Sequence, residues 1–78
     1  MKNNAVINAR VEEILKVIDA RAYTIIYLRD KDGKESLLYS GYLYDALANK
    51  SFIDTYGAYK LVGMSIIVSS VTLLIEEG

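Results

Sequence analysis

The sequence predicts an α+β fold with the element order αββαββ, in which two hairpins form a four-stranded antiparallel sheet and two helices cover one face. Three observations support this prediction. Apolar residues recur at helical spacing near the N-terminus, an Asp-Gly turn separates two strand-forming runs, and a second pair of apolar runs closes the chain. At 78 residues there is room for one hydrophobic core, so residues 1–78 are expected to form a single domain.

The first helix is expected from Val11 to Ile18. Val11, Ile14, Leu15 and Ile18 stand at positions i, i+3, i+4 and i+7, which places them on one helix face. Asn8 is the expected N-cap, since its side chain can accept a hydrogen bond from the first turn.

The first hairpin follows from Tyr23 to Tyr39. Tyr23–Arg29 is rich in aromatic and β-branched residues, Asp30–Lys34 contains the Asp-Gly turn signal, and Leu37–Tyr39 returns as the second strand.

The second half of the chain repeats the pattern of one helix and one hairpin. A short helix is expected over Tyr42–Lys50 with Ser40 as its cap. Residues 51–59 mix aromatic, polar and glycine residues and are expected to be irregular. Lys60–Val68 and Val71–Glu76 then form the closing hairpin.

Strand side chains alternate between the two faces of a sheet, so the register of each hairpin sorts its residues into two sets. The set assigned to the core is Ile26, Leu28, Leu37, Tyr39, Val62, Met64, Ile66, Val68, Val71, Leu73 and Ile75. The opposite face is also apolar, with little relief beyond Arg29, Ser36, Ser65, Thr72 and Glu76. A contiguous patch of this kind marks an interaction surface. Two alternatives stay open: residues 51–59 fold over this face, or the register is shifted by one residue.

Tyrosine supplies most of the aromatic surface, with seven Tyr and one Phe in the chain. Tyrosines are common at binding hot spots because they combine rigid area with a hydroxyl group. Tyr42 and Tyr44 point to different sides of the second helix, so at least one tyrosine there is expected to be accessible. The predicted partner-binding residues are Tyr23, Ile25, Tyr27, Leu38, Tyr42, Leu61, Ile67 and Leu74.

Composition and charge exclude several classes of function. Without Cys or His, thiolate and imidazole metal sites and Cys–His or Ser–His nucleophiles are ruled out. Nine basic and ten acidic residues give a net charge of −1 without a basic face, which argues against duplex nucleic acid as a partner. Val6-Ile7 is too short for a signal peptide, and the apolar run Leu61–Ile75 is interrupted by polar residues, so we expect a cytoplasmic protein without a membrane segment.

The carboxylates are expected to be solvated rather than catalytic. Asp30, Asp32 and Glu35 crowd the hairpin tip without the further ligands of a calcium loop, and Glu12-Glu13 and Glu76-Glu77 are adjacent pairs that diverge. We therefore expect no metal, no cofactor and no enzymatic activity.

Several segments together resemble a loose group of short uncharacterised bacterial proteins that are often encoded by phages and prophages. The resemblance rests on Val11–Ile18, Tyr23–Leu28, Asp32-Gly33, Leu38-Tyr39-Ser40-Gly41 and the closing Val62, Ile66 and Leu73-Leu74-Ile75. It implies a phage-type accessory protein that blocks a host defence component by binding it or its nucleotide signal.

Two functional hypotheses follow. In the first, the chain forms homo-oligomers through the apolar sheet face and binds a host protein. In the second, an oligomer sequesters a nucleotide or cyclic dinucleotide, with bases stacked on tyrosines and phosphates held by Tyr27, Arg29, Tyr59 and Lys60.

Overall fold

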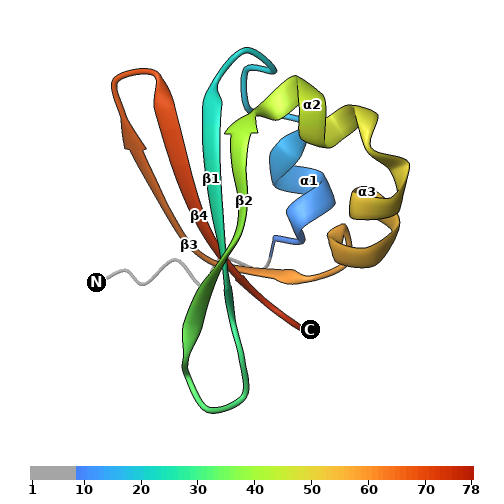
Figure 1. Cartoon of the computed structure of the whole chain (residues 1–78), viewed down its shortest axis with the longest axis vertical. Coiled ribbons are helices and arrows are strands. Elements are labelled where there is room, and N and C mark those ends of the chain that lie inside the picture. Colours follow the sequence, from blue (N-terminus) through green and yellow to red (C-terminus); the bar gives the residue numbers. More distant parts are fainter. Residues whose placement is uncertain (1–8) are drawn as a thin grey trace, which may run out of the picture.

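The computed structural model describes residues 9–78 and shows an α+β fold with one four-stranded sheet (Figure 1). Both expected hairpins are present. The elements are α1 (Val11–Leu15), β1 (Tyr23–Arg29), β2 (Glu35–Tyr42), α2 (Leu43–Ala48), α3 (Lys50–Tyr56), β3 (Lys60–Ile67) and β4 (Ser70–Glu76).

The sheet is mixed, so the prediction of a purely antiparallel sheet is wrong. The strand order is β2-β1-β4-β3, and the central pair β1 and β4 is parallel, from Tyr23 opposite Ser70 to Arg29 opposite Glu76. A tight turn forces the two strands of each hairpin to be antiparallel, whereas the relation between hairpins depends on the connection that joins them. Here the connection through α2 and α3 carries the chain to the far edge, and β4 returns beside β1 in the same direction (Figure 1).

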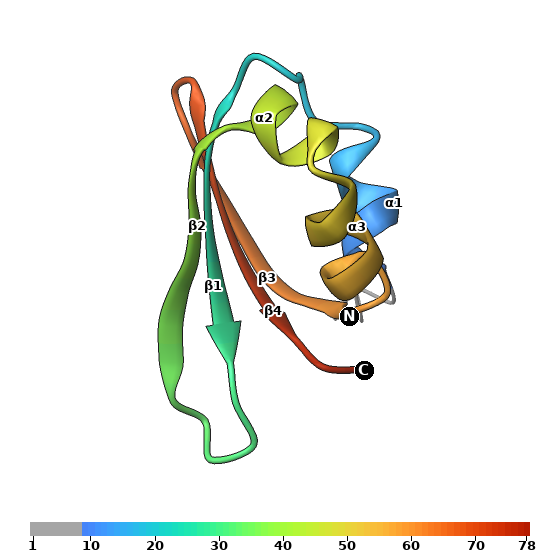
Figure 2. The ribbon, with the colours of Figure 1, turned by 45° about the vertical axis from the view of Figure 1, so that its right-hand side comes forward.

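All three helices of the described chain lie on one side of the sheet (Figure 2). The longest, α3, has seven residues, and no helix within residues 9–78 is long and apolar enough to cross a membrane.

The first helix is shorter than predicted, because α1 ends at Leu15 rather than Ile18. Asp19 accepts a hydrogen bond from the Arg21 N–H at 2.9 Å, and this local bond favours a turn over a further helical turn. At the other end the Arg10 N–H donates to Oε1 of Glu13 at 2.9 Å. The expected cap Asn8 lies outside the described residues.

The expectation that residues 51–59 are irregular is wrong, because α3 occupies most of them. Oδ1 of Asn49 accepts a hydrogen bond from the Phe52 N–H at 3.1 Å, which starts this helix. Asn49 also ends α2, so the expected single helix is divided in two. Ser40 does not cap α2, because it lies in β2 and its hydroxyl bonds that of Tyr23 at 2.8 Å.

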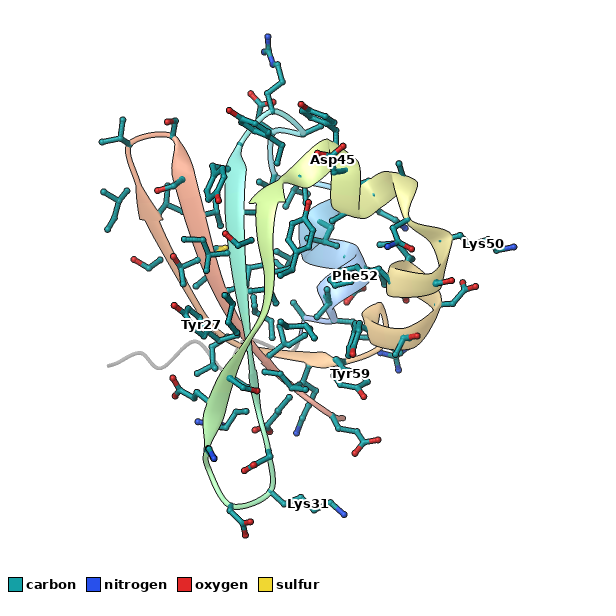
Figure 3. The ribbon with its side chains drawn as sticks, viewed as in Figure 1. Tyr27, Lys31, Asp45, Lys50, Phe52 and Tyr59 are labelled. Carbon is teal, nitrogen blue, oxygen red and sulfur yellow. The ribbon has the colours of Figure 1, made fainter. Side chains whose placement is uncertain are left out.

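The core lies between the helices and the inner side of the sheet. Its buried apolar residues come from α1, α2 and all but one of the strands: Val11, Leu15, Ile26, Leu43, Ala46, Leu61, Val71, Leu73 and Ile75. Burying each large aliphatic side chain contributes about 1.5–3 kcal/mol. On the β2 side, Phe52 of α3 packs on Tyr39 with 5.6 Å between ring centroids (Figure 3).

Candidate interaction surface on the open face of the sheet

The side of the sheet opposite the helices is uncovered by any element of residues 9–78 (Figure 2). Strand alternation decides which residues lie there. In β1, Thr24 and Ile26 are buried against the helices, so Tyr23, Ile25 and Tyr27 lie on the other side. We call this side the open face.

Most of the large side chains on the open face are apolar, and the small polar residues Ser40, Ser65, Ser70 and Thr72 lie among them. Its central residues are half-buried by their neighbours, and its outer residues are exposed. From the strand registers, its large apolar members are Tyr23, Ile25, Tyr27, Leu37, Tyr42, Ile67 and Leu74. A surface of this kind exceeds the scattered apolar residues usual on soluble proteins.

The structure brings most of the predicted partner-binding residues together on this face. Tyr23, Ile25 and Tyr27 of β1, Tyr42 of β2, Ile67 of β3 and Leu74 of β4 occupy one side of the sheet. Leu38 and Leu61 do not, and both exceptions arise at β-bulges.

The bulge in β2 exchanges Leu37 and Leu38. Ile26 pairs with Tyr39 and Tyr27 with Leu37, so Leu38 has no partner on β1. The extra residue shifts the alternation by one. Leu38 therefore packs against the core, and Leu37, predicted for the core, is on the open face with 59% of its surface exposed.

The bulge in β3 moves Leu61 in the same way. Leu61 pairs with Ile75 and Gly63 with Leu74, which leaves Val62 as the extra residue. Leu61 is consequently in the core, with 3% of its surface exposed. Its predicted place on the open face is wrong, since alternation counted without a bulge assigns it to the wrong side.

Aromatic side chains lie together at one end of the open face. Tyr23 and Tyr42 meet edge to face with ring centroids 5.6 Å apart, and Tyr44 stacks on Tyr42 at 5.5 Å. The hydrogen bond between the Tyr23 and Ser40 hydroxyl groups fixes the Tyr23 ring further. These rings are exposed and already held in place, so little side-chain freedom is lost when a partner binds.

Charged side chains lie at the other end of the face. Arg29 Nη2 lies 2.8 Å from Glu76 Oε1, and Lys60 Nζ lies 3.4 Å from Glu76 Oε2. The hydrogen bond from Arg29 lowers the pKa of the Glu76 carboxyl below its ordinary value. The open face thus runs from an aromatic end to a charged end.

The residues expected to hold a nucleotide are not gathered into one site. Tyr27 lies on the open face, whereas Tyr59 lies beneath the helices against Tyr56 (Figure 3). Arg29 and Lys60 do converge, but on the carboxylate of Glu76. The adjacent groove of about 830 Å³ is lined by Leu28, Arg29, Asp30, Lys31, Gly33, Tyr59, Glu76, Glu77 and Gly78. Three carboxylates in that lining oppose a phosphate.

Sequence reasoning missed a second apolar area on the helix side. Because α1 ends early, it leaves a groove of about 560 Å³ beside the distal part of β3 and β4, lined by Ile14, Val17, Ile18, Asp19, Arg21, Ala22, Met64, Ile66, Val68, Ser69 and Val71. Met64 and Ile66 face this side as predicted but are exposed, and Val68 lies in the turn. The Asp19 turn was the signal that the helix stops short.

Among residues 9–78, no three Asp or Glu side chains are close enough together to hold a metal ion. Comparison of the chain with protein-family models, with curated proteins and with solved structures found no match.

Proposed function

We propose that this chain is a non-enzymatic binding and assembly protein that self-associates through the open face. The observation that supports this proposal is the absence of any covering element over that face within residues 9–78, although most of its large side chains are apolar. A single layer of helices covers only one side of a sheet. A second copy of the chain would cover the other side.

The layout of the open face suits a symmetric contact. Ile25 and Tyr27 of β1 and Leu74 of β4 are central, the tyrosine cluster lies at one end, and Arg29, Lys60 and Glu76 lie at the other. Stable interfaces have this arrangement of an apolar centre with aromatic anchors and a polar periphery. In a twofold pair each copy presents the same surface, so the contact closes after two copies.

Analytical ultracentrifugation at micromolar concentration tests self-association. The informative variant is Leu37→Asp, since Leu37 is 59% exposed on the open face, in the edge strand β2. Leu47→Asp is the matched control, because Leu47 is 40% exposed on α2, on the other side of the sheet. We expect oligomers for the unmodified chain and for Leu47→Asp, and monomers for Leu37→Asp with an unchanged circular dichroism spectrum.

A monomeric unmodified chain at all concentrations would contradict self-association. A shift to monomers in both variants would place the contact elsewhere, because the two substitutions differ mainly in the face that they charge.

The resemblance to phage and prophage proteins adds a partner class to the proposal. In this form the open face binds a protein component of host defence, and the same aromatic end makes the contact. A purified candidate host protein should bind the unmodified chain, and Tyr42→Ala should weaken that binding at least tenfold, as expected of an aromatic hot spot. Equal binding by Tyr44→Ala, Tyr42→Ala and the unmodified chain would remove the tyrosine cluster from the contact.

A further inference from the structure

The outer edge of β3 is a second surface, separate from the open face, on which a partner can bind. β3 is the last strand in the order β2-β1-β4-β3, at the rim of the sheet (Figure 1). Among residues 9–78 only the start of this edge is paired, where Arg10 bridges Lys60 and the Leu61 N–H donates to the Ala9 carbonyl oxygen at 3.0 Å. Natural sheets protect a bare edge with charge or proline. β3 has no proline and no charged residue after Lys60.

The turn that closes the hairpin decides which residues of β3 direct their N–H and C=O groups outward. A two-residue turn joins Ile67 to Ser70, and these residues face each other. The residues that flank such a turn exchange both hydrogen bonds, and hydrogen-bonded pairs then alternate along the strands. Ser65 therefore bonds to β4, whereas Met64 and Ile66 direct their backbone groups to the outer edge.

We propose that this edge pairs with the same edge of a second copy, antiparallel and centred on Ser65. In this register Met64 of each copy faces Ile66 of the other, so outward-pointing groups meet outward-pointing groups and each facing pair exchanges both hydrogen bonds. A register centred on Met64 would bring Ile66 opposite Val62, the extra residue of the bulge. A register centred on Ile66 would bring Met64 opposite Val68, in the turn. The edge is thus complementary to itself in the register centred on Ser65.

The charges of β3 also suit a second copy. Lys60 is the one charged residue of the strand and lies at its start. Lys60 precedes Ser65 by five residues in each copy, so the two lysines are separated by about ten residues of strand, or about 33 Å at about 3.3 Å per residue. Within the shared stretch, residues 62–68, uncharged residues face uncharged residues. No like charges are brought together.

The same pairing covers exposed apolar side chains on the helix side. Met64 and Ile66 are 44% and 63% exposed, and they line the groove beside α1 together with Val17 and Ile18. Directly opposite residues of paired strands have Cβ atoms about 5 Å apart, so Met64 of one copy contacts Ile66 of the other. The twofold axis is perpendicular to the sheet, so both open faces lie on the same side and stay available for the contact proposed above.

The edge contact is weak when it acts alone. One short strand per copy is a small contact compared with the ~1,200–2,000 Å² of stable interfaces. We therefore expect edges to pair by themselves at millimolar but not at micromolar concentration. In the unmodified chain the edge contact joins pairs already formed through the open face, because linkage raises the effective concentration of the second contact.

Isotope-filtered nuclear Overhauser contacts test this pairing in Leu37→Asp at millimolar concentration, since this variant carries a charge on the open face. In a mixture of labelled and unlabelled chains, we expect intermolecular contacts between the Met64 and Ile66 amide protons and between the Ser65 Hα protons. Their absence overturns the proposal, and so do contacts that join this edge to residues 1–8 of the same chain. The two contacts fail separately: loss of the open-face contact leaves these signals in place, and loss of the edge contact leaves the micromolar oligomers in place.

Substitutions at Ile66 give the second test. Because the Ile66 N–H points outward, Ile66→Pro removes a hydrogen bond to the second copy and none to β4. We expect the intermolecular contacts to be lost and those between β3 and β4 to be kept. Ile66→Val is the matched control and should keep both. If Ile66→Pro does not fold, Ile66→Lys places a charge on the edge and should abolish the same intermolecular contacts. Intermolecular contacts that persist in the folded Ile66→Pro or Ile66→Lys variant would overturn the edge pairing.

Discussion

The two hairpins differ in how their turns are built. In the β1–β2 turn, Oδ1 of Asp30 accepts hydrogen bonds from the N–H groups of Asp32 and Lys34, both at 2.9 Å, and Gly33 supplies a φ of +83°. In the β3–β4 turn, Val68 adopts a φ of +51° and is 97% exposed, and only Ser70 helps, by donating to the Ile67 carbonyl at 3.1 Å. The first turn uses residues that favour its conformation, and the second imposes it on a β-branched residue.

The hairpins also differ in what covers their helix side. Tyr39 of the first hairpin packs under Phe52 of α3, and Ile26 is fully buried. In the second hairpin, the distal residues Met64 and Ile66 face the same side but extend past the end of α1. Within residues 9–78, the helix side of the second hairpin is therefore less completely covered than that of the first.

The largest expected effect is on the free energy of unfolding, and it comes from alanine substitutions at two isoleucines that face the helix side, one in each hairpin. Ile26→Ala should cost about 2–5 kcal/mol of unfolding free energy, because it empties a fully buried position. Ile66→Ala, at a residue 63% exposed, should cost about 1 kcal/mol or less. Urea denaturation of dilute protein measures both. Equal losses would show that Ile66 is buried in solution and that the two hairpins are covered alike.

A second test alters the favourable turn. Gly33→Ala should destabilise the chain by about 1–2 kcal/mol, because an L side chain is strained at positive φ. No atom lies within 4 Å of the added Cβ, so the effect reports backbone strain alone. Gly33→Asn is the control and should recover part of the loss, since Asn tolerates this conformation. An unchanged urea midpoint in Gly33→Ala would mean that the turn relaxes.

Elements with strong local signals could be predicted from the sequence, whereas pairings that depend on the path of the chain could not. The Asp-Gly signal and the strand composition identified β1 with its observed bounds, Tyr23–Arg29. The parallel pairing of β1 with β4 could not be read from local pattern, because it depends on the path of α2 and α3. Asn49, a strong N-cap residue, was overlooked as the start of a helix.

The open face was predictable only as far as strict alternation holds. Tyr23, Ile25 and Tyr27 follow directly from the register of β1, which has no bulge of its own. Leu38 and Leu61 were misplaced because Leu38 is the extra residue of one bulge and Leu61 directly precedes the extra residue of the other, and one inserted residue reverses the faces. Neither bulge has a sequence signal as strong as the Asp-Gly turn; Gly63 at the second is the nearest to one.

A third test removes the backbone strain at Val68 in the β3–β4 turn. Val68→Gly should stabilise the chain by about 0.5–1 kcal/mol, as glycine removes the strain at positive φ and loses some of that gain to its greater freedom in the unfolded chain. Because Val68 is almost fully exposed, no packing is lost. Val68→Ala keeps the Cβ atom and should gain less. Thermal unfolding monitored by circular dichroism ranks the variants, and a destabilised Val68→Gly would show that the side chain makes a contact outside the described residues.

The smallest effect concerns the ion pair that joins the two hairpins, between Arg29 of β1 and Glu76 of β4. The folded-state pKa of Glu76 is lowered, chiefly by the Arg29 hydrogen bond. A carboxyl with a depressed folded pKa adds stability that is fully present above its unfolded pKa of about 4.3 and is lost as the pH falls through the folded value.

The melting temperature of the unmodified chain should therefore fall more steeply between about pH 5 and pH 3 than that of Glu76→Gln. The difference should shrink in 1 M salt, because both side chains of this pair are partly exposed to solvent. Glu77→Gln, one residue further along the chain, serves as the control and should keep the steep dependence. If Glu76→Gln keeps it as well, the link between the hairpins comes from strand pairing and burial alone.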